Sequence, residues 1–514
     1  MSFGAEAQIV RELGKFLKEG SLYRGYKPVL WSTVEKTALA DAEVEYMDHV
    51  SDTIYAAFKV KESSLDFIKG ADIVIWTTTP WTIPANKALA YNAGLKYILI
   101  EVNDNKNFTN RKIVIAKDLL EPFKKDTSIS NVNVLEEFSG KEFTNTICSH
   151  PFSELGYDYD IPMLEANFVT TEQGTGIVHC APSHGPDDFN LCINNNIKAI
   201  ETVDGDGKYT NEIKIFEGLH IFKANNLIIE KLEEQKNLVT SGKLTHSYPH
   251  SWRSKAPLVH RATPQWFISM ESHGLRDKAL KAIDNTDFYP AKGKDRIRAM
   301  IETRPDWCVS RQRVWGVPLP IFISKKTGEV LVDDNVFENI AKIYEKEGSD
   351  CWFNEDYQPF LGDKYRAEDY EKLSDIVEVW FDSGSTHAFV LEKRDDLKWP
   401  ASMYLEGSDQ HRGWFHSSLL ESCGTRGVAP FESILSHGFV VDGKGLKMSK
   451  STGNVIAPQD ILKKYGADIL RIWVASSNYA EDLRIDYSIL DQLSLIHISE
   501  PTRQAEMSYC GVWV

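Results

Sequence analysis

The stretches "SMYLEGSD" (residues 402–409) and "ILSHGFVV" (residues 434–441) decide the fold class of this chain. Each is a short apolar run that ends in small or polar residues, and "VEVWFDSG" (377–384) is a third run of this kind. Helical patterns alternate with these runs. Such alternation predicts a parallel α/β sheet, which binds its ligands at the carboxyl ends of the strands.

The region before this block has a different pattern. Residues 52–103 contain "TIYAAFKV", "DIVIWTTT" and "YILIEV", which are predicted strands separated by turns. Strand and turn signals continue to about residue 245, with a turn expected at "DGDGK" (204–208). This region therefore reads as one β-rich domain of the size of an insertion. The opening stretch, through "KTALADAEVEY" (36–46), is predicted to be helical. Residues 457–476 are predicted to form helices that pack on the α/β sheet.

Length and composition limit the class of protein. With 514 residues, 42% of them hydrophobic and 26% charged, the chain is expected to fold into two to four globular domains. A net charge of −16 argues against a protein that coats nucleic acid along its whole surface, but it permits a local basic face. No run reaches the length of a membrane span, and the N-terminus lacks a secretory apolar segment. We therefore expect a cytoplasmic protein with no membrane partner.

The seven cysteines are scattered, and none forms a Cys-x-x-Cys pair. An odd number without framework spacing in a long chain is typical of reduced, mostly buried thiols. The sequence therefore predicts no zinc site and no other metal site held by cysteine.

Polar clusters follow the predicted strands. "WFDSGSTH" (380–387) and "YLEGSDQHRGWF" (404–415) each join an aromatic residue to a carboxylate and a small-residue turn. Carboxylates beside such turns commonly hold ribose hydroxyls or an ammonium group, although Glu406 and Asp409 are equally compatible with helix capping. Trp380 and Trp414 are candidates for the wall of an apolar pocket, or for plain core.

A lysine loop, "DGKGLKMSKSTGN" (442–454), comes about 30 residues later. Its glycines allow the loop to change shape at low strain, and its lysines carry compact charges on flexible stems. This combination suits a mobile clamp for an anion. A solvated turn whose lysines contact only water is the alternative.

Together these stretches resemble the class I aminoacyl-tRNA synthetases. "KMSKS" (447–451) resembles the lysine motif of the family, and "EGSDQHRGWF" (406–415) is similar to the isoleucine-specific branch. "RPDWCVSRQRVWGVPLP" (304–320), "RATPQWFISM" (261–270) and "GADILRIWVAS" (466–476) are similar to the same branch. The resemblance extends to about Asp491. It implies a partial Rossmann-type catalytic domain, a doubly wound parallel sheet, with an inserted β-rich editing domain and the start of a helical anticodon-binding domain.

Domain boundaries follow from the resemblance. It implies a catalytic segment and connector at 1–46, the editing domain at 47–245, the Rossmann-type domain with the lysine loop at 246–473, and the start of the anticodon-binding domain at 474–492. The end, 493–514, resembles translated sequencing-library adapter and is expected to be non-native.

The resemblance also implies a reaction, in which isoleucine is activated with ATP and Mg²⁺ and transferred to isoleucine tRNA. Lys447 and Lys450 would face the ATP phosphates, with Ser449 in the same ATP-binding loop, because this reaction needs positioning and charge compensation. The implied substrate-binding residues are Glu406, Gly407, Asp409 and Gln410 for the isoleucyl-adenylate, and Trp380 and Trp414 for the aliphatic side chain.

A second site is implied in the β-rich region, where "WTTTPWTIPAN" (76–86) and "GTGIVHCAPSHGPDDF" (174–189) lie. Without the resemblance, threonines in a strand reflect propensity and histidines in turns are often plain polar loops. The resemblance implies hydrolysis of valine wrongly attached to isoleucine tRNA, without a metal. Asp188 would bind the α-ammonium group, and such a pocket carboxylate is expected to contribute little to the fold. The residues implied to position the 3′ adenosine and a water are Thr77, Thr78, Thr79, Thr82, Asn86 and His179.

Departures from the family leave alternatives open. The family's His-x-Gly-His motif is absent from these 514 residues, so the resemblance implies a fragment that is inactive in aminoacylation. A free-standing aminoacyl-tRNA deacylase and an inert truncation product are the other readings. Many bacterial relatives carry cysteine pairs where Ser32 and Glu35, and His250 and Ser251, stand here, so no metal knuckle is expected.

A basic face for tRNA is expected in spite of the acidic total charge. The candidates are "KGKDRIRAM" (292–300) together with Arg304, Arg311 and Arg313. Phosphate contacts would make tRNA affinity fall steeply with salt. The alternative is that these arginines form buried structural pairs.

Overall fold

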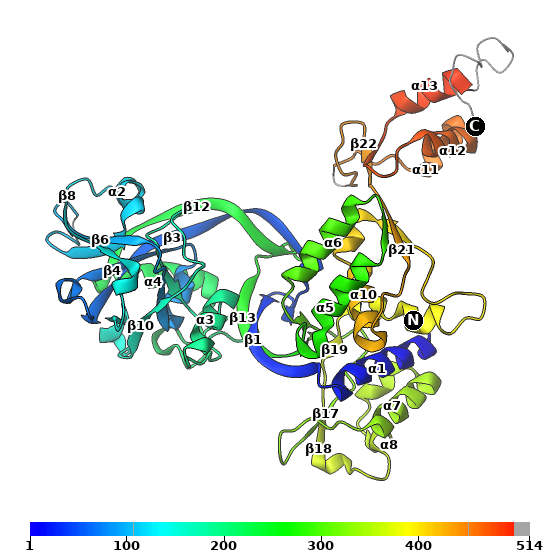
Figure 1. Ribbon diagram of the computed structural model, residues 1–514, viewed down its shortest axis with the longest axis horizontal. Helices are drawn as coiled ribbons and strands as arrows, with labels where there is room; N and C mark the ends of the chain where they lie inside the picture. Colours follow the sequence, from blue (N-terminus) through cyan, green and yellow to red (C-terminus); the bar gives the residue numbers. More distant parts are fainter. Residues whose placement is uncertain (106, 451, 498–514) are drawn as a thin grey trace.

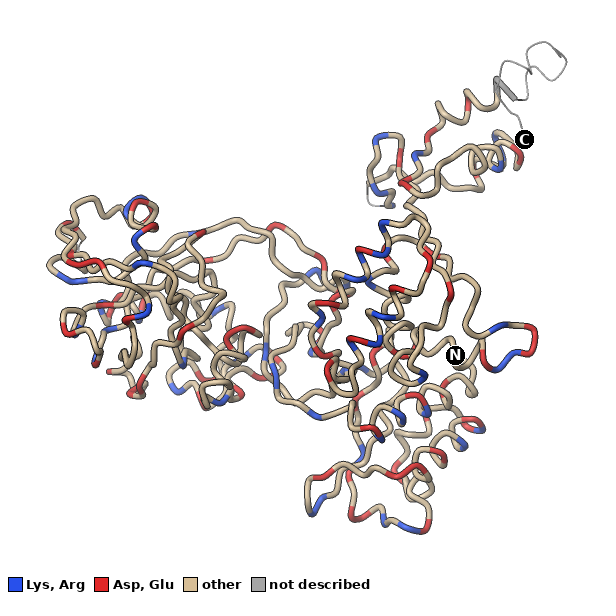
Figure 2. Tube along the Cα trace, viewed as in Figure 1, with Lys and Arg blue, Asp and Glu red and all other residues tan. Residues whose placement is uncertain are grey.

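The structure is a computed structural model that describes residues 1–105, 107–450 and 452–497. Figure 1 shows a β-rich lobe, an α/β body, and a small C-terminal part that extends away from the body. Charged residues of both signs are spread along all three parts (Figure 2). Within the described residues, no helix is long and apolar enough to cross a membrane.

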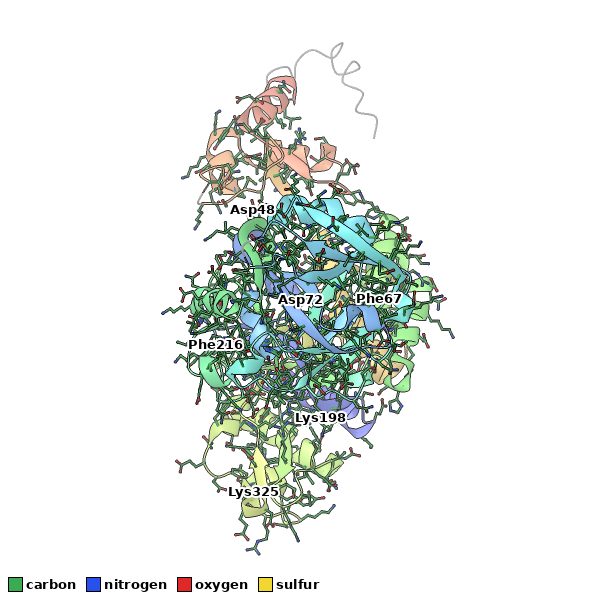
Figure 3. All side chains as sticks on the ribbon, turned by 90° about the vertical axis from the view of Figure 1, so that its left-hand side faces the viewer. Asp48, Phe67, Asp72, Lys198, Phe216 and Lys325 are labelled. Carbon is green, nitrogen blue, oxygen red and sulfur yellow. The ribbon has the colours of Figure 1, made fainter. Side chains whose placement is uncertain are left out.

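The lobe, which faces the viewer in Figure 3, is built on a ten-stranded sheet. In spatial order its strands are β11 (Ile177–Cys180), β5 (Ala88–Tyr91), β10 (Asp160–Glu165), β9 (Ile147–Ser149), β3 (Val44–Glu62), β4 (Asp72–Thr77), β7 (Lys112–Ala116), β6 (Lys96–Val102) and β8 (Val132–Ser139), and β12 (Leu238–Ser251) also pairs with β3. Its helices are α2 (Leu120–Thr127), α3 (Pro186–Asn194) and α4 (Ile221–Glu234). The predicted strands in 52–103 and the turn at 204–208 are confirmed.

A long antiparallel ribbon of β3 and β12 joins the lobe to the body (Figure 1). Its pairing runs without interruption from Thr240 opposite Tyr55 to Ser251 opposite Val44. Most of β3 between residues 44 and 50 is exposed, because no further described strand packs on the ribbon there, while the paired end of β12 is largely half-buried or buried.

The body combines a parallel sheet with several small antiparallel ones. Its parallel sheet has the order β14 (Asp287–Tyr289), β21 (Ser433–His437), β20 (Tyr404–Gly407). A second sheet has the order β15 (Trp307–Cys308), β13 (Val259–Ile268), β1 (Leu22–Ser32), β2 (Thr37–Ala38). Two-stranded pairs are β16 (Ser310–Arg311) with β19 (Ile376–Val377), β17 (Phe322–Ser324) with β18 (Tyr370–Lys372), and β22 (Val440–Asp442) with β23 (Leu483–Ile485).

Helices cover the body and form its C-terminal part. They are α1 (Phe3–Lys18), α5 (Leu275–Asp284), α6 (Lys292–Glu302), α7 (Asp334–Glu347), α8 (Gln358–Leu361), α9 (Val379–Gly384), α10 (Trp414–Arg426), α11 (Pro458–Tyr465), α12 (Ala467–Ser476) and α13 (Tyr487–His497). The apolar face of α1 joins the body core, where Ile9, Leu13 and Phe16 are buried. Buried residues of the lobe form separate clusters.

The parallel α/β sheet predicted from 402–409 and 434–441 is confirmed, but its third strand is not 377–384. That strand is β14, which pairs in parallel with β21. Residues 379–384 form α9 instead, because the Glu378 carboxylate accepts a hydrogen bond from Trp380 N at 3.1 Å and caps a helix at this point.

Two further expectations about the ends of the chain are corrected. The opening stretch is helical only over α1, because residues 22–32 form a strand that pairs with β13 along its whole length. Residues 457–476 do form helices, as predicted, but these do not pack on the parallel sheet. Ile461, Ile469 and Trp473 pack with Ile485 and Leu490 into a core of their own.

Candidate functional site

The lysine loop is folded around one carboxylate. Asp442 Oδ1 accepts hydrogen bonds from Lys444 N at 3.0 Å and from Leu446 N at 2.8 Å. Asp442 Oδ2 accepts a third from Asn454 Nδ2 at 2.8 Å. Gly445 has a φ of 82°, which a side chain would strain. The loop is therefore a defined turn that begins directly after β22.

The loop lysines present their charge to solvent. Lys444, Lys447 and Lys450 are exposed, and none of them forms an ion pair with another residue in the described ranges. Ser449 lies among them, and its Oγ is 2.6 Å from Thr452 Oγ1. Because these three cations have no carboxylate partner in the described part of the chain, the loop is able to take an anion.

The predicted adenylate residues follow the neighbouring strand. β20 and β21 run in parallel with Gly407 opposite His437, so the turn after β20 and the segment leading to the lysine loop leave the same edge of the sheet. Glu406 and Asp409 are exposed. Gln410 Oε1 accepts a hydrogen bond from Trp414 N at 2.9 Å, which fixes the start of α10. Two carboxylates and an amide therefore lie at the strand edge where ligands of such sheets bind.

Close packing constrains this turn. A Cβ atom on Gly407 would lie 2.6 Å from Asp409 Oδ1, and one on Gly413 would lie 2.7 Å from the Trp380 ring. Trp380 therefore lies against the start of α10. Trp414 stacks on Tyr404 at 4.0 Å between ring centroids, and its Nε1 donates to Thr386 Oγ1 at 2.9 Å. Both indole side chains are half-buried, so each packs against the protein and also leaves an edge accessible to solvent.

The lobe holds a second polar constellation. Asn86 Nδ2 donates to Ala88 O at 3.0 Å and contacts His179 Nδ1 at 3.1 Å, so Nδ1 is the acceptor and Nε2 carries the proton. His179 Nε2 then donates to Thr82 Oγ1 at 2.7 Å. Thr82 and Thr79 Oγ1 atoms are 3.3 Å apart, and those of Thr79 and Thr77 are 3.1 Å apart. The structure thus brings five of the seven predicted editing residues into one hydrogen-bonded chain.

This chain of hydrogen bonds gives His179 a positioning role. Both of its ring nitrogens have partners within the protein, and burial lowers its pKa to about 3. The ring is therefore neutral at physiological pH and orients the threonine hydroxyls. His184 lies in the same stretch, 174–189, but contacts Thr202 and the carbonyl oxygen of His260 instead. Burial lowers the pKa of His184 to about 4.

Asp188 has a partner inside the protein, which the sequence reasoning did not anticipate. Its Oδ2 accepts a hydrogen bond from Ala181 N at 2.9 Å, so the carboxylate helps to hold the turn before α3. Its other oxygen accepts no hydrogen bond from another described residue. Burial raises its pKa to about 7, with the backbone hydrogen bond from Ala181 acting in the opposite direction. An Asp188→Ala change would therefore disturb the turn as well as any ligand contact.

A cavity of about 310 Å³ lies beside the threonine row. Thr78 and Thr79 line it, as do Trp81, Tyr248 and His49. The sequence reasoning missed the last three as functional candidates. Trp81 lies within residues 76–86, between Thr79 and Thr82, and this position in the threonine row could have identified it as a site residue. Tyr248 reaches the cavity from β12, which only strand pairing could reveal.

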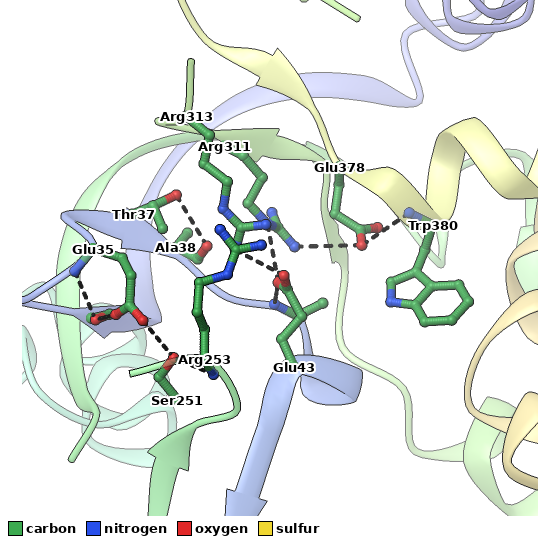
Figure 4. Close-up of polar contacts among 12 residues, drawn as sticks. Glu35, Thr37, Ala38, Glu43, Ser251, Arg253, Arg311, Arg313, Glu378 and Trp380 are labelled. Atoms are coloured by element: carbon green, nitrogen blue, oxygen red, sulfur yellow. Dashed lines mark hydrogen bonds and ion pairs between the residues drawn. The ribbon is translucent and has the colours of Figure 1, made fainter. Parts of the chain in front are cut away.

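The candidate basic face divides into buried and exposed parts. Arg311 is 1% exposed, and its guanidinium lies between Glu43 and Glu378, with ion-pair distances of 3.8 and 3.9 Å (Figure 4). The alternative of a buried structural pair therefore holds for Arg311. Arg304 is half-buried beside Trp307, and Arg313 pairs with Glu43 at 2.8 Å. On α6, Arg298 pairs with Asp284, while Lys292 and Arg296 are exposed.

We expect Arg311→Ala to destabilise the protein. It would leave the Glu43 and Glu378 carboxylates buried without their shared cation, and losing one partner of a buried ion pair costs about 3–5 kcal/mol. A thermal denaturation curve measures the loss. The matched control is Arg296→Ala on the exposed face of α6, which should leave the melting temperature unchanged. Equal melting temperatures for the two variants would contradict the structural role of Arg311.

Three of the four positions of the family's cysteine pairs, Ser32, Glu35 and Ser251, come together in a hydrogen-bonded cluster. Glu35 Oε1 accepts from Ser251 Oγ at 2.8 Å and from Ser254 N at 3.1 Å, and Ser32 contacts the same carboxylate (Figure 4). The turn after β1 is thereby tied to the end of β12. Among the residues that the structure describes, no group of three or more His, Cys, Asp or Glu side chains is arranged to hold a metal ion.

Comparison with known proteins gives consistent matches. The family model of the class I tRNA synthetases (I, L, M and V) matches residues 1–486. An isoleucine–tRNA ligase of Pelagibacter ubique is 79% identical over 492 residues, which are 96% of this chain and 54% of that protein. One of Gluconobacter oxydans is 49% identical over 510 residues, covering 96% of this chain and 53% of that protein. The chain spans about half the length of the curated relatives it matches. A solved complex of an Agrobacterium radiobacter LeuRS with tRNA and LeuAMS matches with 16% identity and a TM-score of 0.37, over 96% of this chain and 60% of that one.

Proposed function

Because the chain belongs to the class I tRNA synthetases (I, L, M and V), we propose that it carries part of an isoleucine–tRNA ligase. The proposed reaction activates isoleucine with ATP to isoleucyl-adenylate and then transfers it to isoleucine tRNA. Two observations carry the proposal. The carboxylate turn after β20 and the segment that leads from β21 to the lysine loop leave the parallel sheet at the same edge, and the three loop lysines form no ion pair among the described residues. Sheets of this kind bind nucleotides at that edge.

In the proposed activation step, the isoleucine carboxylate attacks the α-phosphorus of ATP, and pyrophosphate leaves. Mg²⁺ bound with the ATP would neutralise part of the phosphate charge. Lys447 and Lys450 would contact the phosphates, and negative charge builds on pyrophosphate as the bond breaks. A preorganised cation then stabilises the transition state more than the ground state. Because neither lysine has a carboxylate partner among the described residues, neither must leave an ion pair to do this.

The substrate is proposed to lie along the turn after β20. The exposed Glu406 and Asp409 carboxylates suit the ribose hydroxyls and the α-ammonium group, since ionised acceptors bind such donors strongly. A side chain at Gly407 would displace the Asp409 carboxylate, and Gln410 is held at the start of α10. The open edges of Trp380 and Trp414 suit an aliphatic side chain. We therefore propose ATP, isoleucine and tRNA as the binding partners of this site.

The lobe is proposed to hydrolyse valine from mischarged isoleucine tRNA. Trp81 and Tyr248 are among the aromatic side chains that line the cavity beside Thr78 and Thr79, and such rings suit a nucleobase. The chain from His179 to Thr77 fixes the hydroxyls that would hold the ribose and a water. That water attacks the ester carbonyl, and the products are valine and a free 3′ end. The open oxygen of Asp188 is proposed to bind the α-ammonium group.

A free-standing aminoacyl-tRNA deacylase is the alternative, and the complete lobe network supports it. Two assays on the whole protein separate the readings. Isoleucine-dependent exchange of pyrophosphate into ATP tests the ligase, and release of valine from valyl-tRNA tests the lobe. We expect both activities from the complete ligase of which this chain is proposed to be a part. Hydrolysis without exchange would favour the deacylase, and exchange without hydrolysis would reject the editing proposal.

Hydrolysis should depend on pH through Asp188. Its pKa of about 7 lies above the usual value for aspartate, so it is largely protonated below pH 7 and cannot then pair with an ammonium group. His179 and His184, with pKa values of about 3 and 4, stay neutral throughout. We therefore expect kcat/KM for valyl-tRNA, corrected for uncatalysed hydrolysis, to rise with pH and to level off above about pH 7. A profile of the same shape in Asp188→Asn would contradict this assignment.

A further inference from the structure

Val314 and Trp315 are unusually exposed for apolar residues. Val314 is 99% exposed and Trp315 is 93% exposed, whereas no other large apolar side chain in the described ranges exceeds 68%. Single exposed apolar residues are normal on a protein surface, but two adjacent ones at full exposure are not needed for folding. They lie in the loop between β16 and residue 317.

The loop is held firmly beneath these two side chains. Gln312 N donates to Thr37 Oγ1 at 3.1 Å, and Gln312 Oε1 accepts from Ala38 N at 3.2 Å. Arg313 pairs with Glu43 at 2.8 Å. On the other side, Gly316 lies so close to Ile376 that a Cβ would be 2.5 Å from its side chain. The backbone is thus anchored on both sides of Val314 and Trp315, so the loop presents them at a fixed place.

A second exposed tryptophan, Trp252, is hydrogen-bonded to Glu43, the residue that pairs with Arg313. Trp252 N donates to Glu43 O at 3.0 Å, and Trp252 is 44% exposed. The Arg253 guanidinium lies 5.2 Å from the centre of the Trp252 ring. Arg253 forms no ion pair with any residue that the structure describes, although its side chain and that of Arg313 both point toward Glu43 (Figure 4). An unpaired guanidinium therefore lies beside an exposed indole.

Glu43 marks the base of the ribbon that joins the lobe to the body. It directly precedes β3, and Trp252 directly follows β12. The ribbon joins the lobe, which holds one proposed site, to the body, which holds the other (Figure 1). An RNA end that is charged in the body and hydrolysed in the lobe has to pass between them.

We propose that Trp252, Arg253, Val314 and Trp315 form a platform for the single-stranded 3′ end of the RNA. This junction platform rests on the proposed function. Indole faces stack on any base, and the unpaired Arg253 suits a phosphate, which is the combination that single-strand binding surfaces use. A base-paired stem offers neither free base faces nor the flexibility to follow two separated rings.

The test measures binding of the purified chain to a fluorescein-labelled 12-nucleotide single-stranded RNA that ends in CCA. Fluorescence anisotropy at fixed salt gives the Kd, and the same RNA in a blunt duplex is the comparison. Trp315→Ala should weaken single-strand binding about 5- to 150-fold, the range for one lost base stack, and should change duplex binding by less than about 2-fold. Trp315→Phe should restore most of the affinity. Arg253→Gln should reduce the slope of log affinity against log salt by about 0.7.

Phe353→Ala is the matched control, because Phe353 is an exposed aromatic residue, 47% exposed, outside the platform. It should bind like the unchanged chain. Single-strand affinity that is unaffected by Trp315→Ala would overturn the platform, while hydrolysis of valyl-tRNA by the same protein would leave the proposed function intact. Loss of a dimer in Trp315→Ala, seen by sedimentation velocity, would also overturn it by assigning this surface to a second copy. A protein that neither binds the RNA nor hydrolyses valyl-tRNA would overturn both.

Discussion

Lys450→Ala should lower the rate of isoleucine-dependent exchange of pyrophosphate into ATP by about 100- to 1,000-fold, the usual cost of removing one preorganised electrostatic contact. The measurement requires the whole protein at saturating isoleucine and ATP. Lys450 is exposed and forms no ion pair in the described part of the chain, so its removal leaves no buried charge and should not change the melting temperature. Its proposed partner charge develops only as pyrophosphate leaves. The loss should therefore appear in kcat, with little change in the KM for isoleucine.

Lys444→Ala is the matched control for this prediction. Lys444 lies in the same loop and is equally exposed, but its backbone N–H already serves the Asp442 turn, and no phosphate contact is proposed for it. We expect its exchange rate to stay within a few-fold of the unchanged protein. Equal losses in the two variants would show a general effect of loop charge. A rise in the KM for isoleucine equal to the fall in kcat would contradict a transition-state role for Lys450.

Much of the fold was predictable because local patterns and pairing agreed. The runs at 402–409 and 434–441 became adjacent parallel strands, and the strands of 52–103 became the centre of the lobe sheet. The run at 377–384 failed because the capping carboxylate of Glu378 starts a helix where apolar composition alone suggested a strand. The third strand, β14, is only three residues long and has too little sequence to form a pattern.

Other predictions were wrong where contacts between distant parts of the chain determine the structure. Residues 22–32 carry no strong local signal, and their strand is fixed by pairing with β13, more than 200 residues away in the sequence. The helices of 457–476 have an apolar face, but sequence periodicity does not say which core that face joins. Here it joins Ile485 and Leu490. Periodicity predicts the element, and only the three-dimensional structure identifies its partner.

The candidate sites show the same division. The threonine row and His179 were predicted as a group through a family resemblance, and the structure adds the contacts between the threonine hydroxyls and the direction of the hydrogen bonds from Asn86 to His179 and from His179 to Thr82. Tyr248 was not predicted as a site residue because it reaches the cavity from a strand that is distant in the sequence. Arg311 illustrates a limit of charge patterning, since the sequence shows a cation but not the two carboxylates, Glu43 and Glu378, that surround it.

Asp188→Asn should reduce hydrolysis of valyl-tRNA by at least about 30-fold, the equivalent of ~2 kcal/mol for the loss of one charged partner in a desolvated pair. Asparagine is chosen because its side-chain oxygen can still accept the hydrogen bond from Ala181 N, so the turn before α3 is kept while the negative charge is removed. The readout is kcat/KM at pH 8, where Asp188 is ionised. Exchange of pyrophosphate into ATP, which depends on the body, should not change.

Stability provides the control that separates loss of charge from loss of fold. The folded protein holds Asp188 at a pKa of about 7, above its unfolded value, so the folded state binds the proton more tightly. The stability that this group contributes is therefore complete below about pH 4 and is lost as the pH rises through 7. Asparagine removes the cost of burying that charge, so Asp188→Asn should melt close to the temperature of the unchanged protein at pH 4 and at a higher one at pH 8. A variant that melts lower at both pH values would show that the turn, not the ammonium contact, accounts for any lost activity, and undiminished hydrolysis would reject the assignment of Asp188.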